Sequence, residues 1–194
     1  MSYGNRRIEV TEAAWRVIIR EGLDRTSVRA IAQELGTSTG VVTHYFRGKD
    51  ELTLFALERV FENLLEDVKA YATGQQGIER LEQMIFAALP FEARGIPGWQ
   101  VWVAFLGYAI GRENLVQEHR KRYDFLRQII RQELADLQTA KLIRDDLDLT
   151  LEANALIALV DGIGIGAVIN PEQFYPEQQR FLVRRHIKTL VAAS

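Results

Sequence analysis

The sequence predicts an all-α protein built from about nine helices. Apolar residues recur at a spacing close to 3.6 along the whole chain, and no segment shows the two-residue alternation of a half-buried strand. With 194 residues, of which 47% are hydrophobic, the chain can bury a substantial core. This length fits one large domain, or a small domain joined to a larger one.

Three helices are expected within the first 50 residues. The first spans about residues 6–21 and is followed by Gly22, where a left-handed C-terminal cap is expected. Ser27 is placed to cap a short second helix that ends at Gly36, and Ser38 can cap the third. The apolar face expected for the first helix consists of Ile8, Thr11, Ala14, Trp15, Ile18 and Ile19.

The remaining helices are longer and are separated by recognisable breaks. "RGKDEL" breaks and restarts the chain before a fourth helix, "TGQQG" and "ARGIPG" supply later breaks, and Asp148 or Thr150 is expected to cap the eighth helix. The expected ranges are about 49–73, 78–89, 98–112, 113–139, 151–169 and 176–192.

Composition and charge exclude several classes of protein. The chain has no cysteine, which excludes disulfides and thiolate metal sites and fits a cytoplasmic protein. No secretory signal is expected, and no membrane span, because Glu152, Asn154 and Asp161 interrupt the most apolar stretch. Residues 1–50 carry 8 Lys and Arg against 6 Asp and Glu, whereas the remainder carries 16 against 20. This mild asymmetry hints that the N-terminal part faces an anionic partner.

The segment "TSTGVVTHYFRGK", residues 37–49, has two different faces when drawn as a helix with 100° per residue. One face is small and polar, and consists of Thr39, Gly40, Thr43 and His44. The other is apolar, and consists of Val41, Val42, Tyr45 and Phe46. Because a helix and a glycine turn precede it, the segment is predicted to be the second helix of a helix-turn-helix. On spacing alone, an ordinary packed helix pair fits equally well.

DNA binding gives a physical reason for the small polar face, because a helix enters the major groove only if its leading side chains do not hold it off. Threonine offers a hydroxyl and a methyl group, and Gly40 permits close backbone approach. Arg29 is the best candidate for a bidentate contact with guanine. Phosphates would lie near Thr26, Ser27 and Lys49, and near the helix N-terminus at Ser38.

"TSVRAIAQELGTSTGVVTHYFRGKDEL" resembles the DNA-binding unit of the TetR family of bacterial transcriptional regulators, and is particularly similar to its choline-responsive BetI-like subgroup. The resemblance implies a DNA-binding domain over residues 1–48 and a ligand-binding and dimerisation domain over residues 49–194, with the fourth helix as connector. Carried over by position, Arg29, Thr39, Gly40 and Thr43 face bases, whereas Ser27, His44, Tyr45 and Lys49 mostly hold phosphates. Most family members have Tyr where this chain has Thr43, so the resemblance does not transfer an operator preference.

The resemblance also implies a homodimer that joins through the last two helices, and "ALIALVDGIGIGAVI" resembles the dimerisation helix of the subgroup. The residues expected at this interface are Ile157, Asp161, Gly162, Ile165, Gly166 and Phe181. Glycine costs about 1 kcal/mol relative to alanine inside a helix, and close packing across the interface is one compensation. A bent helix within one subunit is the alternative. Asp161 lies in an apolar run and is expected to have a hydrogen-bond partner.

"GWQVWVAFLGYAIG" lies where the family keeps its effector cavity, and aromatic faces can hold a cation. The effector is therefore expected to be small and largely apolar or cationic. The expected ligand-binding residues are Trp99, Trp102, Phe105 and Tyr108, with Phe86, Phe91 and Tyr123 as secondary candidates. The alternative is that these aromatic residues belong to the core.

Two other functions compete with DNA binding. An enzyme is not expected, since the three histidines are far apart in sequence and no P-loop, GxSxG, metal or cofactor motif occurs. A helical small-molecule-binding or adaptor protein without DNA binding is the second alternative. The predicted function is a ligand-responsive DNA-binding transcriptional regulator, a repressor that leaves a palindromic operator when a small molecule binds its C-terminal domain.

Overall fold

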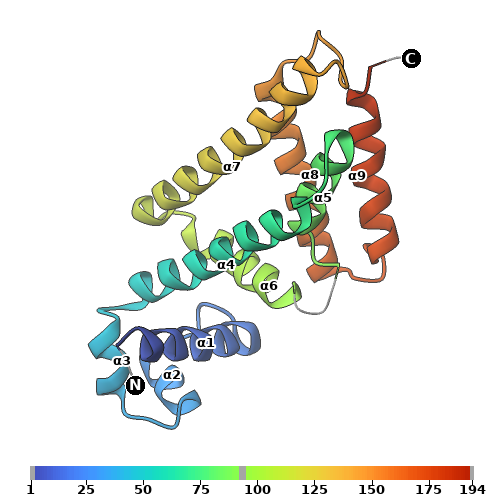
Figure 1. Cartoon of the computed structure of the whole chain (residues 1–194). Helices are drawn as coiled ribbons and strands as arrows, with labels where there is room; N and C mark the ends of the chain where they lie inside the picture. Colours follow the sequence, from blue (N-terminus) through green and yellow to red (C-terminus); the bar gives the residue numbers. More distant parts are fainter. Residues whose placement is uncertain (1–2, 92–94, 193–194) are drawn as a thin grey trace. The chain divides into compact units, whose positions relative to one another are not determined.

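The computed structural model describes residues 3–91 and 95–192, and across these residues it contains nine helices and no strand (Figure 1). The predicted all-α class is therefore confirmed. The helices are α1 (Tyr3–Glu21), α2 (Val28–Glu34), α3 (Thr39–Tyr45), α4 (Lys49–Ala72), α5 (Gly77–Ala87), α6 (Ile96–Ala109), α7 (Glu113–Thr139), α8 (Leu149–Ile169) and α9 (Pro176–Leu190).

The contacts within the chain define two compact units. The head unit consists of the described parts of residues 1–62 and 97–119, and the body unit of the described parts of residues 63–96 and 120–194. In this division α6 and the first half of α4 belong with α1, α2 and α3. The predicted domain boundary after residue 48 stays a prediction.

In the head unit, α1, α2 and α3 enclose a small core. Its buried members are Val10, Ala13, Ala14, Val17, Ile31, Ala32, Val42, Phe46 and Leu52. The predicted face of α1 was partly wrong, because Ile8 and Ile19 are each 37% exposed while Val10 and Val17 are fully buried. Apolar residues occur on more than one side of α1, so the sequence does not single out the side that α2 and α3 cover.

The helix α6 adds two further clusters to the head unit. In the first, Val101 packs with Ile18 of α1 and Ala56 of α4. In the second, Phe105 packs with Leu57 of α4 and Leu115 of α7. The indole nitrogen of Trp15 also donates a hydrogen bond to the Ala56 carbonyl oxygen at 3.3 Å, so α1 is held to α4 by a polar contact as well.

The body unit has one larger core, to which α5, α7, α8 and α9 contribute. Its buried members are Leu81, Ile85, Phe86, Leu89, Leu134, Leu137, Ile143, Ala153, Leu156, Ile163, Val183, Ile187 and Leu190. The end of α9 is tied to the connection before α8, where the Arg144 amide donates to the Leu190 carbonyl oxygen at 2.9 Å.

The local signals for helix ends were largely reliable. Gly22 and Gly36 have φ of +79° and +64°, the left-handed conformation that glycine adopts without strain. The Ser27 hydroxyl caps α2 by accepting from the Ala30 amide at 3.1 Å, and the Asp148 carboxylate caps α8. Ser38 is the N-cap residue of α3, but its side chain makes no capping hydrogen bond.

One helix among the described residues, α8, is long and apolar enough to cross a membrane when judged by those two properties alone. The sequence had predicted no membrane span, because Glu152, Asn154 and Asp161 interrupt this helix. Only 28% of its most apolar window is buried within the chain, so much of its apolar surface is uncovered. A helix that packs in a core or an interface passes the same test, and a single such helix is weak evidence for a membrane span.

Candidate functional site

The exposed face of α3 contains the small polar residues that the sequence predicts there. Thr39, Gly40, Thr43 and His44 are exposed on this face. On the opposite face Val42 is buried, and so is Phe46, which follows the helix directly. The helix packs against α2 through the Gly36 turn, so this pair has the arrangement of a helix-turn-helix. Contact between this exposed face and DNA remains a prediction.

The hydroxyl of Thr43 is oriented by its own helix. It donates to the carbonyl oxygens of Thr39 and Gly40, at 3.2 and 3.3 Å. Because the proton is used within the helix, Thr43 presents its methyl group and its oxygen lone pairs outward. These groups suit the methyl of thymine or an amino donor of cytosine or adenine.

The predicted flanking residues have different environments. Ser27 and Ser38 are exposed, and so is Arg29 on α2. Thr26 is only 3% exposed, and its hydroxyl donates to the Gly22 carbonyl oxygen at 2.9 Å. The Thr26 side chain therefore closes the turn between α1 and α2, and a phosphate near Thr26 stays a prediction.

Lys49 and Tyr45 are half-buried rather than fully exposed. The Lys49 ammonium group donates to the Asp24 carbonyl oxygen at 3.0 Å. Desolvation lowers the pKa of Lys49 from its usual value, and the negative charge of Asp24 opposes this shift. The Tyr45 ring contacts the ring of His44 edge-on, with centroids 5.0 Å apart.

The predicted ligand-binding residues divide between the two units. In the head unit, Trp102 stacks on His119 and Phe105, with ring centroids 5.2 and 5.7 Å away, while Trp99 is half-buried and Tyr108 lies near the end of α6. Phe105 is buried among core residues, which is the alternative role that its spacing allowed.

The three candidates of the body unit are also packed. Phe86 is buried in the core and meets Phe91 with ring centroids 5.4 Å apart. The Tyr123 hydroxyl donates to the Asp161 carboxylate at 2.5 Å, which is the kind of partner expected for Asp161. Burial, followed by the charge of Asp161, raises the pKa of Tyr123 well above its usual value, so the hydroxyl remains a donor at neutral pH.

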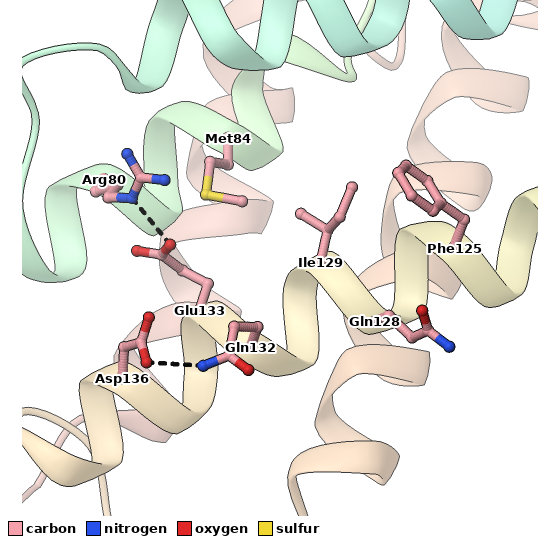
Figure 2. Close-up of a pocket in the computed structure, with 8 residues that line it drawn as sticks. All are labelled: Arg80, Met84, Phe125, Gln128, Ile129, Gln132, Glu133 and Asp136. Carbon is pink, nitrogen blue, oxygen red and sulfur yellow. Dashed lines mark hydrogen bonds and ion pairs between the residues drawn. The ribbon is translucent and has the colours of Figure 1, made fainter.

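A groove of about 380 Å³ lies between α5 and α7 in the body unit (Figure 2). Its lining residues are Arg80, Met84, Phe125, Gln128, Ile129, Gln132, Glu133 and Asp136. None of these residues was predicted from the sequence. Residues 125, 129, 132, 133 and 136 recur at helical spacing, but their mixed polarity is also typical of a solvent-exposed face.

The groove has an apolar end and an acidic end. Phe125 and Ile129 lie at one end, and Phe125 is 46% exposed (Figure 2). At the other end Arg80 forms an ion pair with Glu133 at 2.9 Å, and Asp136 accepts from Gln132 at 2.9 Å. The lining residues at this end thus include two carboxylates, of Glu133 and Asp136, and one guanidinium, of Arg80.

The residues expected at a dimer interface are only partly exposed in the single chain. Phe181 is 62% exposed, and Gly162 and Ile165 are exposed on α8. Ile157 is buried in the chain. A Cβ atom added at Gly166 would lie 2.6 Å from the Phe174 ring, so contact within its own chain already explains this glycine.

Two family models match the chain, one over the helix-turn-helix and one over the C-terminal part. The model for "Bacterial regulatory proteins, tetR family" matches residues 10–54, which include α2 and α3. The model for "BetI-type transcriptional repressor, C-terminal" matches residues 77–192.

Similar proteins agree with this assignment over nearly the whole chain. HTH-type transcriptional regulator PksA of Bacillus subtilis (strain 168) is 30% identical over 192 residues, covering 98% of this chain and 92% of that protein. HTH-type transcriptional regulator BetI of Vibrio vulnificus (strain YJ016) is 28% identical, covering 94% and 91%. The crystal structure of a candidate transcriptional regulator from Saccharomonospora viridis in complex with choline is 26% identical, with a TM-score of 0.89 over 98% of this chain and all of that one.

The helix-turn-helix and the matches together define the protein as a transcriptional regulator of the helix-turn-helix class. More particularly, the chain belongs to the TetR family and has a C-terminal part of the BetI type.

Proposed function

We propose that this regulator is a repressor that binds a palindromic operator as a homodimer and leaves it when a small molecule binds. The observation that carries the proposal is the exposed small polar face of α3, held outward by Val42 and Phe46 beneath it. In this proposal Arg29, Thr39, Gly40 and Thr43 contact bases, whereas Ser27, Ser38, His44, Tyr45 and Lys49 contact phosphates.

The uncovered apolar surface of α8 and α9 supports a homodimer. Ile169 is 70% exposed and Phe181 is 62% exposed, so each leaves a large apolar side chain open to a partner. We therefore assign the interface to Gly162, Ile165 and Phe181, together with Ile169. The domain assignment of residues 1–48 to DNA binding and residues 49–194 to effector binding and dimerisation is part of the same proposal, as is a cytoplasmic location.

A cationic, partly apolar effector is supported by two acidic features of the body unit. The Asp161 carboxylate lies on α8 within an apolar run, and the groove between α5 and α7 has an acidic end opposite its apolar end at Phe125 and Ile129. Choline, the molecule bound in the related structure from Saccharomonospora viridis, has this chemistry and is the first ligand to test. In the head unit, the aromatic faces of Trp99 and Trp102 are a separate candidate for holding such a cation.

Selection of bound DNA from a random pool tests the proposal. The purified protein should enrich a sequence with two inverted half-sites, and choline or a similar cation should lower its affinity for that sequence. The change in Trp fluorescence on titration reports ligand binding separately. Enrichment of no sequence, with ligand binding intact, would instead support the alternative of a helical small-molecule-binding protein.

A further inference from the structure

Tyr108, near the C-terminal end of α6, has two cationic side chains close to its ring. The Lys49 ammonium nitrogen is 4.9 Å from the centroid of its ring, and the Arg112 guanidinium carbon is 3.8 Å from the same centroid. The electron-rich face of an aromatic ring attracts cations at these distances. The Tyr108 ring thus attracts both charges although they repel each other. Desolvation, and to a lesser extent the repulsion from Arg112, lowers the pKa of Lys49.

The hydroxyl of Tyr108 is fixed as well. It donates to one oxygen of the Asp50 carboxylate at 2.9 Å, and the Asn114 side-chain amide donates to the other oxygen at 3.5 Å. Asp50 is the second residue of α4, so this hydrogen bond ties the beginning of α4 to the end of α6 within the head unit.

The ammonium group of Lys49 is consequently held from two directions. It donates to the Asp24 carbonyl oxygen in the turn between α1 and α2, and the ring of Tyr108 lies beside it. An ammonium group has three donors, so this arrangement leaves donors for another acceptor. Without the ring, the flexible stem of Lys49 would sample more conformations and lose more entropy on binding.

We propose that Tyr108 is a positioning residue for DNA binding: its ring places the Lys49 ammonium group, and its hydroxyl places the beginning of α4 through Asp50. A residue of α6 thereby sets the strength of a phosphate contact. This inference rests on the proposed function, because it needs Lys49 to contact the operator backbone.

A double-mutant cycle on operator affinity tests the inference. Wild type, Tyr108→Leu, Lys49→Ala and the double variant are titrated into labelled operator at several salt concentrations. Tyr108→Leu should weaken binding about two- to fivefold, the loss expected when one exposed cation–π contact is removed. In the Lys49→Ala background, which should lower the salt slope by about 1, the same change should have no further effect.

Two outcomes would overturn the inference. One is an equal loss from Tyr108→Leu in both backgrounds, and the other is no loss, or a gain, in the wild-type background. If Tyr108→Leu lowers the unfolding temperature, the cycle is repeated with Tyr108→Phe, which removes the donor, and Asp50→Ala, which removes the acceptor. These two changes remove the same hydrogen bond, so their losses of affinity should not add, and additive losses count against the inference.

The cycle also separates this inference from the proposed function. A wild-type protein that binds no DNA defeats the proposed function. A wild-type protein that binds its operator, with Tyr108 and Lys49 acting independently, defeats only the positioning role of Tyr108.

Discussion

Arg29 is the residue for which the expected DNA contact is most specific, because guanidinium is the group that pairs best with guanine in the major groove. Its side chain is exposed on α2, beside the recognition helix α3. Arg29→Ala should cost about 1–3 kcal/mol at one base pair and relax discrimination there. Affinities for operators changed at each position measure this.

The matched control for Arg29 is Arg131→Ala, which removes the same charge from the exposed surface of α7 in the body unit. It should leave discrimination unchanged. A uniform loss across all operator sequences for Arg29→Ala would mean that Arg29 contacts only phosphate.

Ser27 combines a structural role with a predicted DNA contact, and the two can be separated. Its hydroxyl caps α2, so Ser27→Ala should lower the free energy of unfolding by about 1 kcal/mol. Ser27→Asp keeps an oxygen acceptor for the cap and should fold with nearly wild-type stability, but its negative charge should weaken DNA binding. Thermal unfolding and operator titration of both variants measure the two effects. Wild-type DNA affinity for Ser27→Asp would remove Ser27 from the interface.

At the scale of single helices, the packing around two glycines of α8, Gly162 and Gly166, can be tested. A methyl group at Gly166 would meet the Phe174 ring at 2.6 Å, whereas nothing in the same chain lies within 4 Å of one at Gly162. Gly166→Ala should therefore be destabilising, since overpacking costs about 1–3 kcal/mol and exceeds the gain of about 1 kcal/mol in helix propensity. Unfolding temperatures of the two alanine variants provide the measurement. Equal stability of both would contradict the packing described here.

The helices differ in how well the sequence predicts them, and the reason is the range of the interactions involved. The turn at Gly36, the cap at Ser27 and the two faces of α3 depend on residues within a few positions, and all were predicted correctly. The buried side of α1 depends on which helices cover it, and its prediction was partly wrong.

In the candidate site too, contacts between residues far apart in the sequence were not predicted. The groove between α5 and α7 pairs Arg80 with Glu133, which are 53 positions apart, and Tyr108 meets Asp50 across 58 positions. No local sequence pattern predicts contacts between residues this far apart. The sequence thus predicted the exposed residues of α3, but neither the groove nor the environment of Tyr108.

At the scale of the whole molecule, the proposed homodimer depends on the uncovered apolar surface of α8 and α9. Phe181→Glu should give a monomer in sedimentation experiments and should weaken operator binding, because one head unit cannot occupy both half-sites. Phe125→Glu is the matched control, since Phe125 is also exposed but lies on α7. It should remain a dimer. A dimeric Phe181→Glu protein would place the interface elsewhere.

The central claim is that the exposed face of α3 enters the major groove, and a pair of glycine substitutions tests it most directly. At Gly40 an added Cβ would have only the Ser38 hydroxyl oxygen within 4 Å, and at Gly107 on α6 it would have no neighbour within 4 Å. Both glutamate variants should therefore fold. In titrations with the selected operator, Gly40→Glu should abolish specific binding while Gly107→Glu binds like the wild type. Wild-type affinity for Gly40→Glu would contradict the claim.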